Sequence, residues 1–149
     1  MPMASAGRTP FSPYIATDSS IPIVAADLLD PEVSHAYITW ALLASGEDAK
    51  EFAAEIGTVQ KAAESTKNSY VVALAANVML AADRKEASRK LIDRLIQLQD
   101  RDGSIPGATT SIVGSSGESL TVETTALATL AFSNDLDDID FADKGVRYL

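Results

Sequence analysis

Hydrophobic residues alternate between two kinds of predicted helix along the chain. Residues 36–44, 69–82 and 122–132 are apolar around almost the whole circumference of a helix. Such helices have no face suited to solvent, so we expect them to be enclosed. Residues 47–64 and 84–99 instead place apolar residues on one face at the i, i+3, i+4 and i+7 spacing. We expect these two helices to keep one face in water.

Residues that cap helices support these boundaries. Asp30 followed by Pro31 is typical of an N-cap and a first helical turn, and Gly46 can close the same helix. Asp83, with Glu86 three positions later, matches the pattern of a capping box at the start of the second amphipathic helix. The pattern therefore predicts where these helices begin and end.

The alternation of the two helix types also predicts an architecture. The apolar helices can bury their surface if they form an inner layer, with the amphipathic helices packed around them as an outer layer. Tyr37 and Tyr70 mark equivalent positions 33 residues apart, which is the spacing of one helical hairpin per repeat. We predict an all-α array of about three hairpins over residues 30–149.

The segments outside the helices have their own signals. Residues 1–29 contain prolines at positions 2, 10, 13 and 22, which favour extended backbone, so we predict an extended lead-in. A Gly- and Ser-rich turn within 109–122 could join two short strands as a β-hairpin. Residues 134–140 form an acidic link before the last segment.

Composition narrows the classes of partner. A length of 149 residues suits one domain, and a net charge of −9 repels nucleic-acid phosphates and anionic lipids. The absence of cysteine excludes disulfides and thiolate sites. No apolar run approaches the roughly 18 residues of a membrane span, and the first residues lack the order of a signal peptide. We expect neither a nucleic-acid partner nor a membrane span.

One short motif links the chain to known helical folds. Leu95, Gln99, Gly103 and Ile105 follow the spacing L-x3-Q-x3-G-x-aromatic, with isoleucine in place of the aromatic residue. This spacing is similar to one that recurs in α/α toroids such as terpene cyclases, prenyltransferases and complement-like thioester domains. The resemblance implies that the hairpins form part of an α/α toroid.

The order of longer segments resembles one of these families more specifically. Residues 32–43, 68–91 and 119–132 are similar, in this order, to the second half of the thioester-containing domain of the α-macroglobulin family. The resemblance covers residues 30–149. It implies part of a large extracellular or periplasmic protein that traps proteases or tags surfaces, with a target protease and neighbouring domains as partners.

The resemblance does not transfer the family's covalent chemistry. The reactive Cys-Gly-Glu-Gln run of the family lies upstream of the region matched here, and this chain contains no cysteine. We therefore predict a non-catalytic module without catalytic residues, cofactor or metal site. The alternatives are a fragment of a toroid enzyme of the terpene-cyclase or prenyltransferase kind, and a plain interaction scaffold.

Candidate catalytic residues have simpler interpretations. His35 is the single histidine, no metal-binding spacing surrounds it, and it does not match the acylating histidine of complement-type proteins. Ser115 and Ser116 lie in a glycine-rich turn that fits neither a P-loop nor a nucleophile elbow. Trp40 and Tyr70 lie on enclosed helices, so core packing is expected, with an aromatic-lined pocket as the alternative.

An acidic motif requires the closest comparison. Asp135, Asp137 and Asp138 form the D-x-D-D pattern with which some terpene cyclases protonate their substrates. That chemistry needs a protonated acid in an apolar cavity that excludes water. A calcium loop would need a central glycine and a final glutamate, which are missing here. We expect a solvated acidic link.

The array is expected to leave apolar surface uncovered. A closed toroid needs about twice as many hairpins as this sequence supplies, and a helical repeat without a neighbour exposes its apolar face. The ending at Tyr148 and Leu149 falls where another unit of the same motif would begin. We expect either a homo-oligomer or coverage of the open side by residues 1–29.

Overall fold

The chain folds into three consecutive helical hairpins. The computed structural model describes residues 30–149, and the expectations for residues 1–29 lie outside that range. The helices are α2 (Pro31–Ala44), α3 (Ala53–Ser65), α4 (Ser69–Ala81), α5 (Lys85–Leu98), α6 (Gly117–Phe132) and α7 (Ile139–Tyr148), with short 3-10 helices η3 (Ala49–Phe52) and η4 (Leu136–Asp138). Residues 30–149 contain no β-strand, so the predicted all-α class is confirmed.

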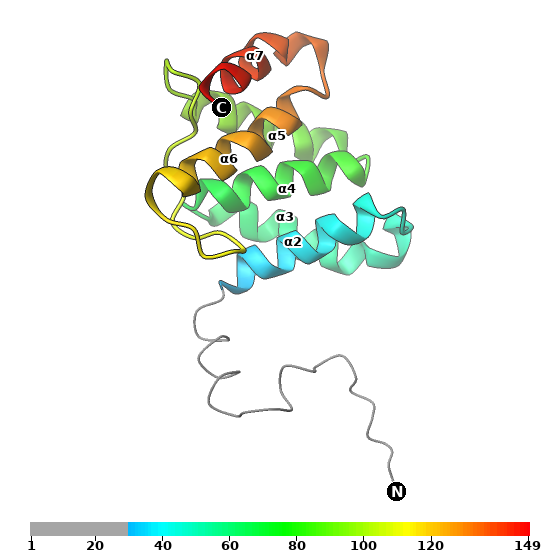
Figure 1. Ribbon diagram of the computed structural model, residues 1–149. Coiled ribbons are helices and arrows are strands. Elements are labelled where there is room, and N and C mark those ends of the chain that lie inside the picture. The colour runs from blue at the N-terminus through cyan, green and yellow to red at the C-terminus, as the bar shows by residue number, and fades with distance from the viewer. Residues whose placement is uncertain (1–29) are drawn as a thin grey trace, which may run out of the picture.

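The hairpins form two layers. Helices α2, α4 and α6 lie side by side, α3 and α5 lie behind them, and α7 packs along one edge (Figure 1). Helix α4 is central, because it packs against α2, α3, α5 and α6. This arrangement of apolar and amphipathic helices agrees with the prediction for part of an α/α toroid.

The three apolar helices differ in how much they are enclosed. Every residue of α4 from 69 to 79 is buried. In α2, however, Tyr37 and Ile38 are 37% and 56% exposed, and in α6 Val122 and Leu130 are 41% and 46% exposed. The expectation of three enclosed helices is therefore wrong for α2 and α6. In the described part, only α4 has helical neighbours on both sides within its layer.

Some capping predictions are confirmed and one is wrong. The Asp30 carboxylate accepts a hydrogen bond of 2.9 Å from the amide of Glu32, and Gly46, at φ +100°, closes α2. Asp83, however, does not cap α5. It adopts φ +56° and follows α4 in the left-handed conformation, because the chain turns tightly there.

The predicted β-hairpin at 109–122 is also wrong. Helix α6 begins at Gly117, so the residues expected to form the second strand are helical. The backbone amide of Thr109, which a β-hairpin would pair with a second strand, donates to the Asn68 side chain at 3.0 Å. Thr110 donates to Asp30 at 2.8 Å and accepts from Asn68 at 2.9 Å. The connector is thus tied to the N-cap residues of α2 and α4.

The Q-x3-G-x motif forms a clasp between the connector and α7. The Gln99 side-chain amide donates to the carbonyls of Gly103 at 3.1 Å and Phe141 at 3.0 Å. Gly103 adopts φ +94°, and a Cβ there would lie 1.9 Å from the Lys144 carbonyl oxygen. Ile105 is completely buried, so an aliphatic residue fills the position that is aromatic in similar motifs.

No helix between residues 30 and 149 has the length and apolar character required to cross a membrane.

Candidate functional site

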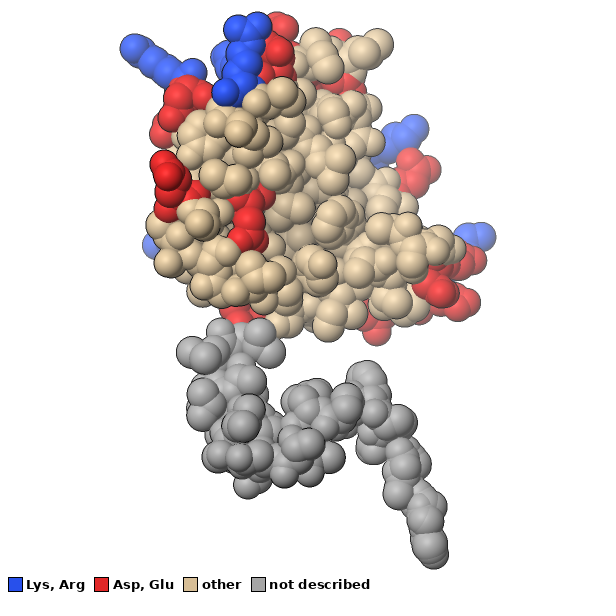
Figure 2. All heavy atoms as spheres, in the orientation of Figure 1, with Lys and Arg blue, Asp and Glu red and all other residues tan. Residues whose placement is uncertain are grey.

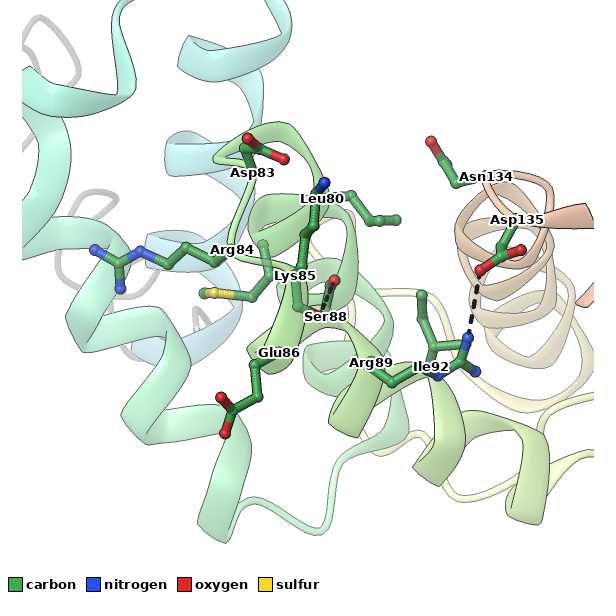
Figure 3. A pocket seen from close by; sticks show the side chains of 11 residues that line it. Leu80, Asp83, Arg84, Lys85, Glu86, Ser88, Arg89, Ile92, Asn134 and Asp135 are labelled. Atoms are coloured by element: carbon green, nitrogen blue, oxygen red, sulfur yellow. Dashed lines mark hydrogen bonds and ion pairs between the residues drawn. The ribbon is translucent and has the colours of Figure 1, made fainter. Parts of the chain in front are cut away.

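A hollow in the described surface lies where the α4–α5 turn faces the segment after α6. It has a volume of about 670 Å³. Its walls combine the apolar Met79, Leu80 and Ile92 with charged side chains of both signs. Figure 3 shows Arg89 extending from α5 towards Asp135 on the opposite wall. The hollow is therefore lined by segments that are distant in the sequence.

Arg89 organises one wall of this hollow through ion pairs. Its guanidinium donates to both oxygens of Asp138, at 2.8 and 3.3 Å. It also lies 2.7 Å from the Asp93 carboxylate and 3.9 Å from that of Asp135. Hydrogen bonding to Asp138 is the main cause that raises the pKa of Arg89 above its ordinary value. Its charge is thus compensated within the protein.

The fold places the aspartates of the D-x-D-D motif in different environments. Asp138 is only 4% exposed, so the expectation of a solvated link is wrong for this residue. Asp135 and Asp137 are exposed, and the Asp135 carboxylate accepts from the amide of Asp137 at 3.0 Å, which starts η4. The chain bends here so that Asp138 points back at Arg89. The motif shapes a turn and an ion pair.

Ser115 has a carboxylate partner. Its hydroxyl donates to Glu123 on α6, and its backbone amide donates to the Ser111 hydroxyl at 3.0 Å. Ser116 immediately precedes α6 and makes no side-chain capping bond. No histidine lies within this group of side chains, so it lacks the histidine base of a Ser-His-Asp triad. Both residues shape the end of the connector.

The aromatic candidates lie in different environments. Tyr70 is 2% exposed and lies beside the backbone of Ile112 and the carboxylate of Glu123. Burial is the main cause that raises its pKa. Trp40 is half-buried and meets Tyr37 edge to face, with ring centroids 6.2 Å apart. Core packing, as predicted, describes Tyr70 better than Trp40.

His35 lies in a hollow between α2 and α3. The hollow has a volume of about 230 Å³ and includes Glu32 and Thr58 in its walls. Among residues 30–149, no group of three or more His, Cys, Asp or Glu side chains is placed to hold a metal ion. His35 and Glu32 alone would not complete a protein site for zinc.

Two arginines have roles that the sequence analysis did not identify. Arg94 reaches across from α5 and donates to the carbonyl of Ala63 at 2.7 Å and to that of Thr66. It thereby caps the C-terminal end of α3. The i,i+4 spacing of Arg89 and Asp93 was a usable signal for one ion pair. The partners Asp138 and Thr66 were not predictable, because they are distant in the sequence.

Comparisons with models of protein families, with characterised proteins and with solved structures gave no match to this chain.

Proposed function

We propose that this chain is a non-catalytic helical module of an α-macroglobulin-like protein that traps proteases. The observation that carries the proposal is the engagement of the candidate reactive groups in contacts between segments. Asp138 is bound by Arg89, and Ser115 is bound to Glu123. Asp138 would have to leave the Arg89 contact before it could protonate a substrate as a general acid, and Ser115 has no histidine beside it.

The hairpin architecture also supports this proposal. The Gln99 clasp joins α5, the connector and α7, and it uses the motif on which the resemblance to α/α toroids rests. In a repeat array each hairpin provides a surface for its neighbours. A module of this kind would contribute packing surface and rigidity to a larger protein. An extracellular or periplasmic location belongs to the same proposal, because it follows from the same resemblance.

The test uses the complete protein that contains this chain. Incubation with an active protease should give a larger complex in which the protease still cleaves small substrates but not large ones. A protease inactivated beforehand is the control, because conformational trapping requires cleavage. An unaltered protease, without complex formation, would contradict the trapping function.

A plain interaction scaffold is the second candidate, and one surface favours it. The face over α2, α4 and α6 carries few charged side chains, which gather instead at its margins (Figure 2). Ile38, at 56% exposure, lies on α2. If the scaffold function alone is correct, the complete protein leaves the protease unaltered. Ile38→Asp should then make the complete protein more susceptible to limited proteolysis, because neighbouring domains lose an apolar contact.

Asp137→Asn separates both proposals from the toroid-enzyme alternative. Asp137 is exposed and its backbone amide, not its carboxylate, makes the turn bond. The substitution should therefore leave the fold intact. A measurable activity on prenyl diphosphates that is lost in Asp137→Asn would favour the enzyme and contradict the non-catalytic module.

A further inference from the structure

The outer side of the α6–α7 hairpin carries an apolar groove of about 490 Å³. Leu130 of α6 and Ile139 and Val146 of α7 lie along it, and these side chains are 46%, 49% and 61% exposed. Asp143 is the one charged residue in its lining. Large apolar side chains gathered in this way mark an interaction surface more often than scattered single residues do.

The groove is held in shape by close packing beneath it. A Cβ at Gly145 would lie 2.0 Å from the Thr129 hydroxyl oxygen, so α6 and α7 approach more closely there than a larger residue allows. Phe132 and Phe141 pack on the buried side, with ring centroids 6.1 Å apart. A partner would therefore bind a surface that is already formed, which reduces the entropy cost of binding.

The charges of α7 change sign along the helix. Asp140 lies near its start and Arg147 near its end. Within the helix, Arg147 Nε lies 2.8 Å from the Asp143 carboxylate, and the Arg147 side chain is 77% exposed, so its guanidinium stays accessible to a second carboxylate. The two residues are seven positions apart, so they project from nearly the same side of the helix, next to the apolar stripe of Ile139 and Val146. A second α7 running in the opposite direction would place its Arg147 beside Asp140, and its Asp140 beside Arg147.

We propose that this groove binds the same groove of a second copy of the chain, in a two-fold symmetric dimer with antiparallel α7 helices. Such an isologous contact uses one surface twice. It buries both apolar stripes and forms the Asp140–Arg147 pair twice. This charge complementarity favours a second copy of the chain as the partner. The dimer goes beyond the proposed function and does not depend on it.

The dimensions of the groove set the strength expected of this dimer. Helices α6 and α7 have 16 and 10 residues, so they are about 24 and 15 Å long. A contact surface of this length and about two helices in width buries about 400 Å² per copy. A standard stable interface buries about 800 Å² per partner. We therefore expect a weak, concentration-dependent dimer with a dissociation constant in the micromolar range or above.

The first test measures self-association of the full chain by sedimentation velocity across the micromolar range. Val146→Glu should weaken the dimer about tenfold or more, because two unpaired carboxylates would be buried at the contact. Val113→Glu is the matched control, since Val113 is a 72% exposed valine in the connector. A monomeric wild type, or equal weakening by both substitutions, would overturn the proposal.

The second test examines the antiparallel charge pairing directly. Asp140→Lys and Arg147→Glu should each weaken self-association, because each places like charges opposite one another. A mixture of the two variants should associate more tightly than either alone, since opposite charges then face each other at both positions of the mixed dimer. Circular dichroism confirms that each variant is folded. A mixture that associates no better than its components would refute the proposed geometry.

Discussion

Gln99 shows how one side chain can join segments that are separated in the sequence. It follows α5, and its amide nitrogen binds the carbonyls of Gly103 in the connector and Phe141 in α7. Both carbonyls lie beside the tight approach of Gly103 to Lys144. The amide is therefore expected to stabilise the third hairpin.

Gln99→Met keeps the length of the side chain but removes both hydrogen bonds. We expect the free energy of unfolding to fall by about 1–3 kcal/mol, since each bond contributes about 0.5–1.5 kcal/mol net. Chemical denaturation followed by circular dichroism measures the change. Gln97→Met on the exposed side of the same helix is the control. Equal losses in the two variants would show that the clasp has no special contribution.

Tyr70 predicts a dependence of stability on alkaline pH. Burial raises the pKa of its phenol above the ordinary value of 10.0. As the pH rises past that value, the unfolded chain loses the phenolic proton while the folded chain keeps it, so the stability contribution is lost as the pH approaches the folded pKa. Thermal unfolding on both sides of pH 10 should therefore show a smaller decrease for Tyr70→Phe than for the wild type.

The control for this prediction is Tyr148→Phe. Tyr148 is the last residue of α7 and is not among the groups that raise the pKa of Tyr70, so the variant should retain the full alkaline decrease of the wild type. A decrease that is the same in Tyr70→Phe and Tyr148→Phe would mean that other groups cause it.

The α4–α5 turn determines how the second hairpin closes. The amide of Arg84 donates to the carbonyl of Met79 at 2.9 Å and that of Asp83 to the carbonyl of Leu80 at 3.1 Å, so the last carbonyls of α4 are satisfied. Asp83 must adopt φ +56° to allow this. An aspartate tolerates this conformation less well than glycine does.

Asp83→Gly should therefore stabilise the protein. We expect a gain of up to about 1 kcal/mol in the free energy of unfolding, because glycine adopts the left-handed conformation without a Cβ penalty. Asp83→Ala is the matched control, since it also removes the carboxylate but keeps the Cβ. Urea denaturation of the two variants tests this prediction. A gain of similar size in Asp83→Ala would assign the effect to the charge and not to the backbone.

At the scale of the whole molecule, one contact joins α5 to the start of α7. Arg89 and Asp138 are 49 residues apart in sequence and form a paired hydrogen bond. Asp138 is nearly inaccessible, whereas the Arg89 side chain is 38% exposed. Solvent therefore weakens this ion pair relative to a fully buried one. The pair still fixes the direction in which the chain leaves α6.

Asp138→Asn should lower the free energy of unfolding by about 1–3 kcal/mol, below the range for fully buried pairs because of this exposure. Hydrogen exchange should accelerate first in α7, since its link to α5 is weakened. Asp137→Asn is the control on the exposed neighbouring carboxylate. Unchanged exchange in α7 of the Asp138→Asn variant would contradict this role.

The sequence alone determined the helical class, the hairpin order and several helix ends. These properties are local, because the apolar periodicity and caps such as Asp30 and Gly46 act within a few residues. The Q-x3-G-x spacing also identified the residues of the clasp, although it did not identify Phe141 as the partner of Gln99. Local patterns thus predicted the elements without their contacts.

The tertiary structure decided which surfaces are covered and which polar groups meet. The apolar sequences of α4 and α6 look alike, yet α4 has neighbours on both sides and α6 leaves Val122 and Leu130 exposed. Asp138 belongs to an acidic run that suggested a solvated link, but the fold places it against Arg89. Burial and pairing depend on segments brought together from distant positions, and no local pattern specifies them.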